Sequence, residues 1–214
     1  SRGLGDVYKR QPLDLIDAAE ARISAIDSEI NALPTLCLER ARDRARELLA
    51  GKRCEARGEP GWLAGLPVAI KDLVDVAGVR TTYGSPIFAD HVPETSHPLV
   101  ERIERRGGVV IAKSNTPEFG AGGSTFNEVF GKTRNPWNTS LTPAGSTGGG
   151  AAALAAGETG PAGTRLAAGE WLTAGPDEVE RRNVASCPVE STPADRRSGS
   201  ATSGSVSYTP LTLP

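Results

Sequence analysis

Apolar positions near the start of the chain recur at steps of three and four residues. Between residues 12 and 27 these positions are Leu15, Ile16, Ala19, Ile23 and Ile26. Residues 36–50 repeat the pattern, with Arg and Glu filling the opposite face. A period near 3.6 with Pro12 at the first position predicts an amphipathic helix over residues 12–27, and a second helix over residues 36–50.

Two short apolar runs further along the chain predict buried strands. The first is "LPVAIKDLVDV", residues 66–76, which is rich in β-branched side chains but interrupted at Lys71 and Asp72. The second covers residues 109–112, and a helical pattern over residues 95–106 lies between them. The order helix, strand, helix, strand indicates an α/β fold in which helices flank a mostly parallel sheet.

The pattern weakens at both ends of the chain. Residues 1–11 share no periodicity with the residues after them, and residues 158–214 are poor in large apolar side chains and rich in Gly, Pro, Ser and Thr. Such a segment buries too little apolar surface to offset its chain entropy. We therefore expect a non-native leader over residues 1–11, a folded part over residues 12–157 and a disordered or out-of-frame tail over residues 158–214. The chain contains no Met, which is typical of a fragment.

Composition narrows the class of function. The formal net charge is −2, so nothing favours binding to nucleic acid or to a membrane. The three cysteines are widely spaced, and neither they nor the two histidines form a metal-binding motif; they are Cys37, Cys54, Cys187, His91 and His97. No metal and no cofactor is predicted. No apolar run of membrane-spanning length and no signal peptide occurs, which favours a reduced, cytoplasmic location.

The stretch "TPAGSTGGGAAALAAG", residues 142–157, predicts a tight loop that leads into a helix. No Lys follows the glycines as a phosphate-binding loop requires, and the glycine spacing does not fit a dinucleotide-binding turn. Taken alone, Ser146 is explained as a helix cap. Taken alone, Lys71 is explained as a solvated charge at the end of a strand.

Three segments taken together change this interpretation. They are "GLPVAIKD" at residues 65–72, "KSNTPEFGAGGST" at residues 113–125 and "TRNPWNTSLTPAGSTGGGAAALAAG" at residues 133–157. In this order they resemble the amidase signature family, whose members hydrolyse amides with a Ser–cis-Ser–Lys triad. The resemblance covers residues 12–157. It implies that Lys71 is the catalytic lysine and Ser146 the bridging serine, with a cis peptide bond after Gly145. It also implies that Gly122, Gly123, Ser124, Thr125, Gly145 and Thr147 form or support the substrate loop.

The implied chemistry is a proton relay. A lysine accepts a proton only when neutral, so burial would have to lower the pKa of Lys71 by about 3 units from its reference value of about 10.4. Ser146 would then pass to Lys71 the proton of a nucleophilic serine. We expect the Lys71 amine and the Ser146 hydroxyl to lie within hydrogen-bonding distance or one water apart. The implied substrate is a small-molecule amide.

The sequence departs from the family pattern at two places. The family loop Gly-Gly-Ser-Ser-Gly-Gly-Ser appears here as residues 144–150, "AGSTGGG", which keeps small side chains and one extra hydroxyl at Thr147. Further on, the family has Gly-Thr-Asp-x-Gly-Gly-Ser, which supplies the nucleophile and the oxyanion hole. Here that region is "GTRLAAGEW", with Gly169 and Glu170 where the serine would fall. No nucleophile is found, so we expect this chain to be inactive.

Two hypotheses remain open on the sequence. The first is a fragment of a serine amide hydrolase; the family includes stand-alone amidases and the A subunit of glutamyl-tRNA amidotransferase, and the residues fit both. The second is a non-catalytic α/β binding or interaction module, whose exposed sheet edge would favour association. An in-frame Gly-Thr-Asp-x-Gly-Gly-Ser motif downstream of Gly157 in the genomic reading frame would support the first hypothesis, a fragment of a serine amide hydrolase.

Overall fold

A computed structural model describes residues 11–52, 57, 59–159 and 167–168 of the chain. Its centre is a small sheet in which the strand order is β1-β3-β2-β6. Strand β2 (Pro67–Lys71) runs parallel to β3 (Val109–Ser114) and to β6 (Ala167–Ala168), whereas β1 (Thr35–Leu36) is antiparallel to β3. The mostly parallel α/β sheet expected from the sequence is confirmed.

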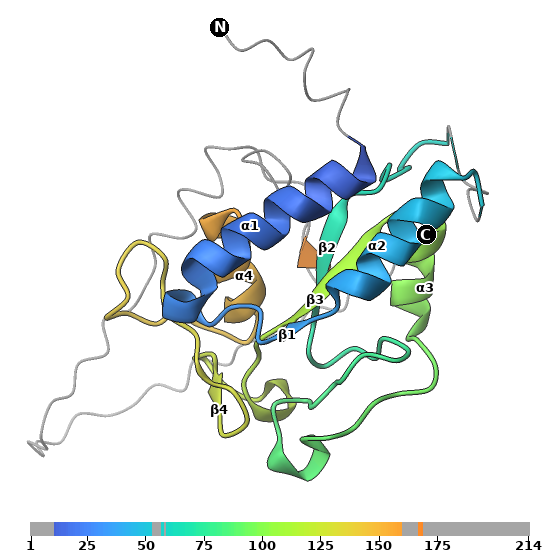
Figure 1. Ribbon diagram of the computed structural model, residues 1–214. Helices are drawn as coiled ribbons and strands as arrows, with labels where there is room; N and C mark the ends of the chain where they lie inside the picture. The colour runs from blue at the N-terminus through green and yellow to red at the C-terminus, as the bar shows by residue number, and fades with distance from the viewer. Residues whose placement is uncertain (1–10, 53–56, 58, 160–166, 169–214) are drawn as a thin grey trace, which may run out of the picture.

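Helices α1 (Pro12–Ile30) and α2 (Leu38–Leu49) lie side by side over the sheet (Figure 1). The backbone N–H of Gln11 donates to the Asp14 carboxylate at 2.9 Å, which satisfies a donor at the start of α1. Asn31 ends α1 in the left-handed conformation. Both predicted helices are confirmed, and α1 continues three residues past the predicted end at Asp27. Helix α2 begins at Leu38 rather than at Leu36, because Leu36 belongs to β1.

The sheet separates two apolar cores. Helices α1, α2 and α4 (Gly148–Ala156) contribute to the core on one face, together with Val109 and Ile111 of β3. Helix α3 (Pro98–Arg105) and the segment after β2 contribute to the core on the other face. Its buried members are Val68, Ile70, Val76, Val79, Val100 and Val110. Both faces of the strands are buried, which is why their sequence is a continuous apolar run.

The structure defines the boundaries of the two predicted strands. The strand predicted within residues 66–76 ends at Lys71, in agreement with the placement of that lysine at a strand end, because residues 72–97 form turns, irregular segments and the short 3-10 helix η2 (Pro86–Phe88). The strand expected over residues 109–112 extends to Ser114. Lys113 therefore lies in β3 rather than in the loop that comes after it.

The helix expected over residues 95–106 is α3, which begins later than predicted. His97 stands at the cap position before the helix, and its Nδ1 accepts from the Leu99 N–H at 3.1 Å. Pro98 occupies the first helical position, where its missing N–H costs no hydrogen bond. These two residues explain why the helix starts after His97.

The remaining described elements are short and lie between β3 and α4. They are the 3-10 helix η3 (Glu118–Gly120) and the antiparallel pair β4 (Phe126–Asn127) and β5 (Gly131–Lys132). Within the described part of the chain, no helix combines the length and the apolar character needed to cross a membrane.

The start of α4 approaches the end of β3 closely because glycines stand there. A Cβ on Gly149 would lie 2.4 Å from the backbone O and 2.5 Å from the backbone N of Asn115. Real Cβ atoms do not approach backbone atoms this closely, so only glycine allows this helix position. Gly149 therefore allows the start of α4 to lie against the end of β3.

Replacing Gly149 with Ala is expected to lower the free energy of unfolding by about 1–3 kcal/mol, the usual cost of overpacking. An ordinary Gly→Ala change inside a helix instead stabilises by about 1 kcal/mol. Gly123→Ala is the matched control, because a Cβ there meets no atom within 4 Å. Urea unfolding followed by circular dichroism measures both. A Gly149→Ala chain as stable as the original would contradict the close packing.

The structure describes four residues of the predicted tail. Glu158 and Thr159 are buried, and Ala167–Ala168 form β6, which pairs with Ala69 and Ile70 of β2. These four residues are ordered, and the expectation of little order over residues 158–214 as a whole stays a prediction. The rest of the predicted tail, and residues 1–10 of the predicted leader, lie outside the described residues.

Candidate active site

Lys71 is the last residue of β2, and its side chain reaches the loop before α4. The Lys71 Nζ donates to Ser146 Oγ at 2.9 Å and to Thr147 Oγ1 at 3.1 Å. The predicted contact between Lys71 and Ser146 is therefore confirmed. It also excludes the interpretation of Lys71 as a charge held only by solvent.

The loop that carries Ser146 has the predicted backbone geometry. The peptide bond between Gly145 and Ser146 is cis, and Ala144 has a positive φ of 63°. Thr125 holds the loop on both sides: its Oγ1 donates to the Ala144 carbonyl at 2.9 Å and accepts from the Gly148 N–H at 3.0 Å.

The interpretation of Ser146 as a helix cap is wrong. The cap position of α4 belongs to Thr147, and its side chain makes no capping hydrogen bond. The Ser146 hydroxyl instead accepts from the Lys71 amino group. Ser146 is thus oriented toward Lys71 rather than toward the helix.

The second predicted loop lies directly against the first. A Cβ on Gly145 would lie 3.0 Å from the Gly122 carbonyl and 3.1 Å from the Ser124 N. Gly122, Gly123 and Gly145 are exposed, whereas Ser124 and Thr147 are half-buried and Thr125 is buried. The structure brings these predicted loop residues to one place, next to Lys71 and Ser146. Their role in binding a substrate stays a prediction.

A buried amide network, which sequence reasoning missed, fixes the end of β3 beside this site. Asn115 Oδ1 accepts from Asn127 Nδ2 at 2.7 Å, and Asn115 Nδ2 donates to Thr133 Oγ1 at 3.0 Å. Asn127 Nδ2 also donates to the Thr116 carbonyl at 2.8 Å. The signal was present in the sequence, because an Asn directly after a buried strand must find partners for its amide.

The fully buried lysine of this region is Lys113, not Lys71. Lys71 is half-buried, so the expectation that it is a buried lysine is corrected. The Lys113 Nζ donates to the Val74 carbonyl at 2.8 Å and to Thr81 Oγ1 at 2.7 Å, and lies 3.3 Å from Asp72 Oδ1. Burial lowers the pKa of Lys113 from its ordinary value, and the nearby Asp72 carboxylate opposes that shift.

The two histidines are engaged elsewhere in the fold. The His91 ring stacks on Tyr83 with ring centroids 5.8 Å apart, and His97 caps α3. Among the described residues, no group of three or more His, Cys, Asp or Glu side chains could hold a metal ion.

Comparison with known proteins agrees with the site geometry. The family model described as Amidase matches residues 14–163. The chain is 42% identical over 156 residues to the A subunit of the Geotalea daltonii glutamyl-tRNA(Gln) amidotransferase, covering 72% of this chain and 32% of that protein. It is 41% identical over 143 residues to the corresponding protein of Bacillus velezensis, covering 67% of this chain and 29% of that protein. The chain belongs to the amidase signature family of amide hydrolases.

Solved structures show the same likeness. A 6-aminohexanoate cyclic dimer hydrolase complexed with substrate matches with a TM-score of 0.63 and 32% identity, covering 74% of this chain and 31% of that one. The A subunit of the Thermotoga maritima glutamyl-tRNA(Gln) amidotransferase matches with a TM-score of 0.56 and 31% identity, covering 69% of this chain and 29% of that one. The chain therefore spans less than a third of the length of these relatives, and its fold is a part of theirs.

Proposed function

We propose that this chain carries the proton-relay side of a Ser–cis-Ser–Lys amide hydrolase. Lys71 is the base and Ser146 the bridging residue between that base and a nucleophilic serine. The contact of 2.9 Å between Lys71 Nζ and Ser146 Oγ supports this proposal most directly. Thr147 Oγ1 gives the amino group a second hydroxyl partner, which fixes its direction.

In the relay, the neutral Lys71 amine accepts the proton of the Ser146 hydroxyl. The Ser146 oxygen at the same time accepts the proton of the nucleophile, whose oxygen attacks the amide carbon. The protons then return along the same path to the leaving amine. General base catalysis of this kind contributes about 10²–10⁴-fold to a rate.

We also propose that this chain lacks the nucleophile. Gly169 and Glu170 occupy the region where the family has its serine, and they lie outside the described residues. Without a nucleophile and the donors that accompany it, Lys71 and Ser146 have no hydroxyl to activate. The substrate of the complete catalytic unit is proposed to be a small-molecule amide, with no nucleic acid or membrane partner and a cytoplasmic location. Association through an exposed edge of the sheet remains a further proposal.

The purified chain is expected to release no ammonia or amine above background from glutamine, a simple aliphatic amide or an aryl amide. Loss of a single oxyanion donor alone typically costs about 10²–10³-fold in rate. Coupled ammonia detection and chromatography of the amine product provide the measurement. Turnover that disappears in Ser146→Ala would show that Ser146 itself acts as the nucleophile, and would overturn the proposed role.

A chimera tests the relay directly. Residues 12–157 of this chain are joined to the remaining part of the Geotalea daltonii protein, which is chosen to supply the family's Gly-Thr-Asp-x-Gly-Gly-Ser segment. We expect the folded chimera to hydrolyse an amide, and Lys71→Ala to reduce the rate by about 10²–10⁴-fold. An active chimera that keeps its rate in both Lys71→Ala and Ser146→Ala would refute the assignment.

A further inference from the structure

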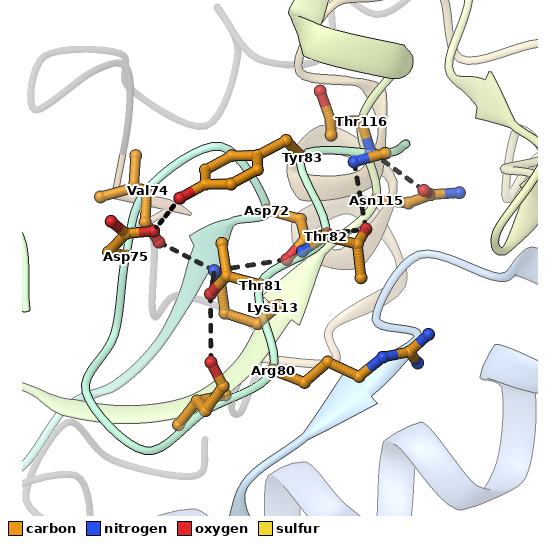
Figure 2. Close-up of polar contacts among 12 residues, drawn as sticks. Asp72, Val74, Asp75, Arg80, Thr81, Thr82, Tyr83, Lys113, Asn115 and Thr116 are labelled. Atoms are coloured by element: carbon orange, nitrogen blue, oxygen red, sulfur yellow. Dashed lines mark hydrogen bonds and ion pairs between the residues drawn. The ribbon is translucent and has the colours of Figure 1, made fainter. Parts of the chain in front are cut away.

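A buried ion pair lies on the face of the sheet opposite to Ser146. Lys113 and Asp72 are both fully buried, and Lys113 Nζ lies 3.3 Å from Asp72 Oδ1. The other carboxylate oxygen, Oδ2, accepts from the Thr82 N–H at 3.0 Å and from Thr82 Oγ1 at 2.6 Å (Figure 2). Among the described residues, Asp72 Oδ1 accepts no hydrogen bond, so the Lys113 ammonium is its partner.

The pair is joined to Lys71 through the geometry of the strands. Ile70 of β2 stands beside Lys113 of β3, and Lys71 stands beside Ser114. Because side chains alternate along a strand, Lys71 points to the face of α4, whereas Ile70 and Asp72 point to the other face. Lys71 is therefore flanked by one residue that packs in the second core and one that is held by Lys113.

The backbone around Asp72 is fixed by the same contacts. The Asp72 N–H donates to the Ser114 carbonyl at 3.0 Å, and its carbonyl accepts from the Tyr83 N–H at 3.0 Å. Lys113 Nζ also donates to the Val74 carbonyl, so it holds the turn after β2 at two points. The strand cannot shift at Lys71 unless these contacts break.

We propose that Lys113 and Asp72 are positioning residues that hold the Lys71 amino group against the Ser146 hydroxyl. This inference rests on the proposed function, since it assigns the pair a part in keeping the relay aligned. Lys113 acts through Asp72 and the backbone of β2, from the face of the sheet opposite to the Ser146 loop. Asp75 also faces Lys113, and its carboxylate accepts from the Tyr83 hydroxyl at 2.7 Å.

The test measures the chemical accessibility of the Lys71 amine in the full 214-residue chain. Acetic anhydride labels neutral amines, and peptide mass spectrometry gives the rate at Lys71 relative to exposed Lys132 in the same molecule. Rates measured across a range of pH separate the pKa of Lys71 from the limiting rate of its neutral amine. The limiting rate reports whether the amine is held in place.

The informative variant replaces both members of the pair, as Lys113→Met with Asp72→Asn, so that no buried charge is left unpaired. We expect the relative limiting rate at Lys71 to rise by about fivefold, which is the factor by which the loss of one hydrogen bond changes an equilibrium. The circular dichroism spectrum is expected to stay unchanged. Exposed Arg46 and Asp43, replaced together as Arg46→Met and Asp43→Asn, form the control and leave that rate unchanged. A folded double variant with the original Lys71 rate would overturn the proposal.

Two further variants keep the outcome decisive. Should the double variant not fold, Thr82→Val takes its place, since it removes one hydrogen bond from Asp72 while keeping both charges. We expect the relative limiting rate at Lys71 to rise by about twofold in Thr82→Val. An unchanged Lys71 rate in Thr82→Val would also overturn the proposal. Ser146→Ala combined with Thr147→Val tests the proposed function separately: an unchanged Lys71 rate in that variant refutes the relay contact itself, whatever the ion pair does.

Discussion

The Lys113→Met variant is expected to lose about 3–5 kcal/mol of unfolding free energy at pH 7, the usual cost of breaking a buried ion pair from one side. Methionine is unbranched like lysine and shorter by only the terminal amino group, so most of the loss does not come from an empty space. The cost arises because the Asp72 carboxylate stays fully buried with Oδ1 facing no cation. The Val74 carbonyl and the Thr81 hydroxyl lose a donor as well.

Urea unfolding of the single and double variants measures this cost. Lys113→Met with Asp72→Asn is expected to be more stable than Lys113→Met alone, because it removes the unpaired charge as well as its partner. Arg46→Met breaks an exposed ion pair with Asp43 and is expected to change the free energy of unfolding by less than about 1 kcal/mol. Equal costs for Lys113→Met and Arg46→Met would contradict the importance of the buried pair.

The periodicity of the chain predicted the helices and the parallel strands because these elements bury continuous apolar faces. The interruption at Lys71 and Asp72 marked the end of the first strand, although the apolar run continues past Lys71 through Val74 and Val76. Those valines pack on the second core from the segment after the strand. An apolar run records that side chains are buried and does not record the backbone conformation that buries them.

The contact between Lys71 and Ser146 was predicted from segments far apart in sequence, through the resemblance to a family. The burial of Lys113 was not, because a lysine before a polar loop has the pattern of an exposed residue. Only the register between β2 and β3 shows that Lys113 stands beside Ile70 and meets Asp72. Partners that are brought together by strand pairing leave no periodic signal along the chain.

The stability of the fold is expected to decrease as the pH rises, owing to Glu158. This carboxyl group is fully buried directly after α4, and neither of its oxygens has a hydrogen-bond partner among the described residues. Burial raises the pKa of Glu158 to about 8; the Asp27 carboxylate adds to the shift and Arg22 opposes it. The native state therefore keeps the proton of Glu158 at a pH where the unfolded chain has released it.

The sign and size of the effect come from this difference between the two states. Below the ordinary glutamate pKa of 4.5 both states are protonated, so Glu158 costs nothing. Between pH 4.5 and about 8 the unfolded state binds fewer protons, and the free energy of unfolding falls by about 1.4 kcal/mol per pH unit. The accumulated loss is on the order of 5 kcal/mol, and above that window the contribution of Glu158 is constant.

Replacing Glu158 with Gln isolates this contribution, because the amide keeps the shape of the protonated carboxyl and cannot ionise. We expect the difference in unfolding free energy between Glu158→Gln and the original chain to be small near pH 5 and to grow by a few kcal/mol toward pH 8. Glu29→Gln on the exposed face of α1 is the matched control and should give a difference that does not vary with pH. Urea unfolding at several pH values provides both curves. Parallel curves for Glu158→Gln and the original chain would show that the Glu158 carboxyl ionises as freely in the folded protein as in the unfolded one, contrary to its burial without a partner.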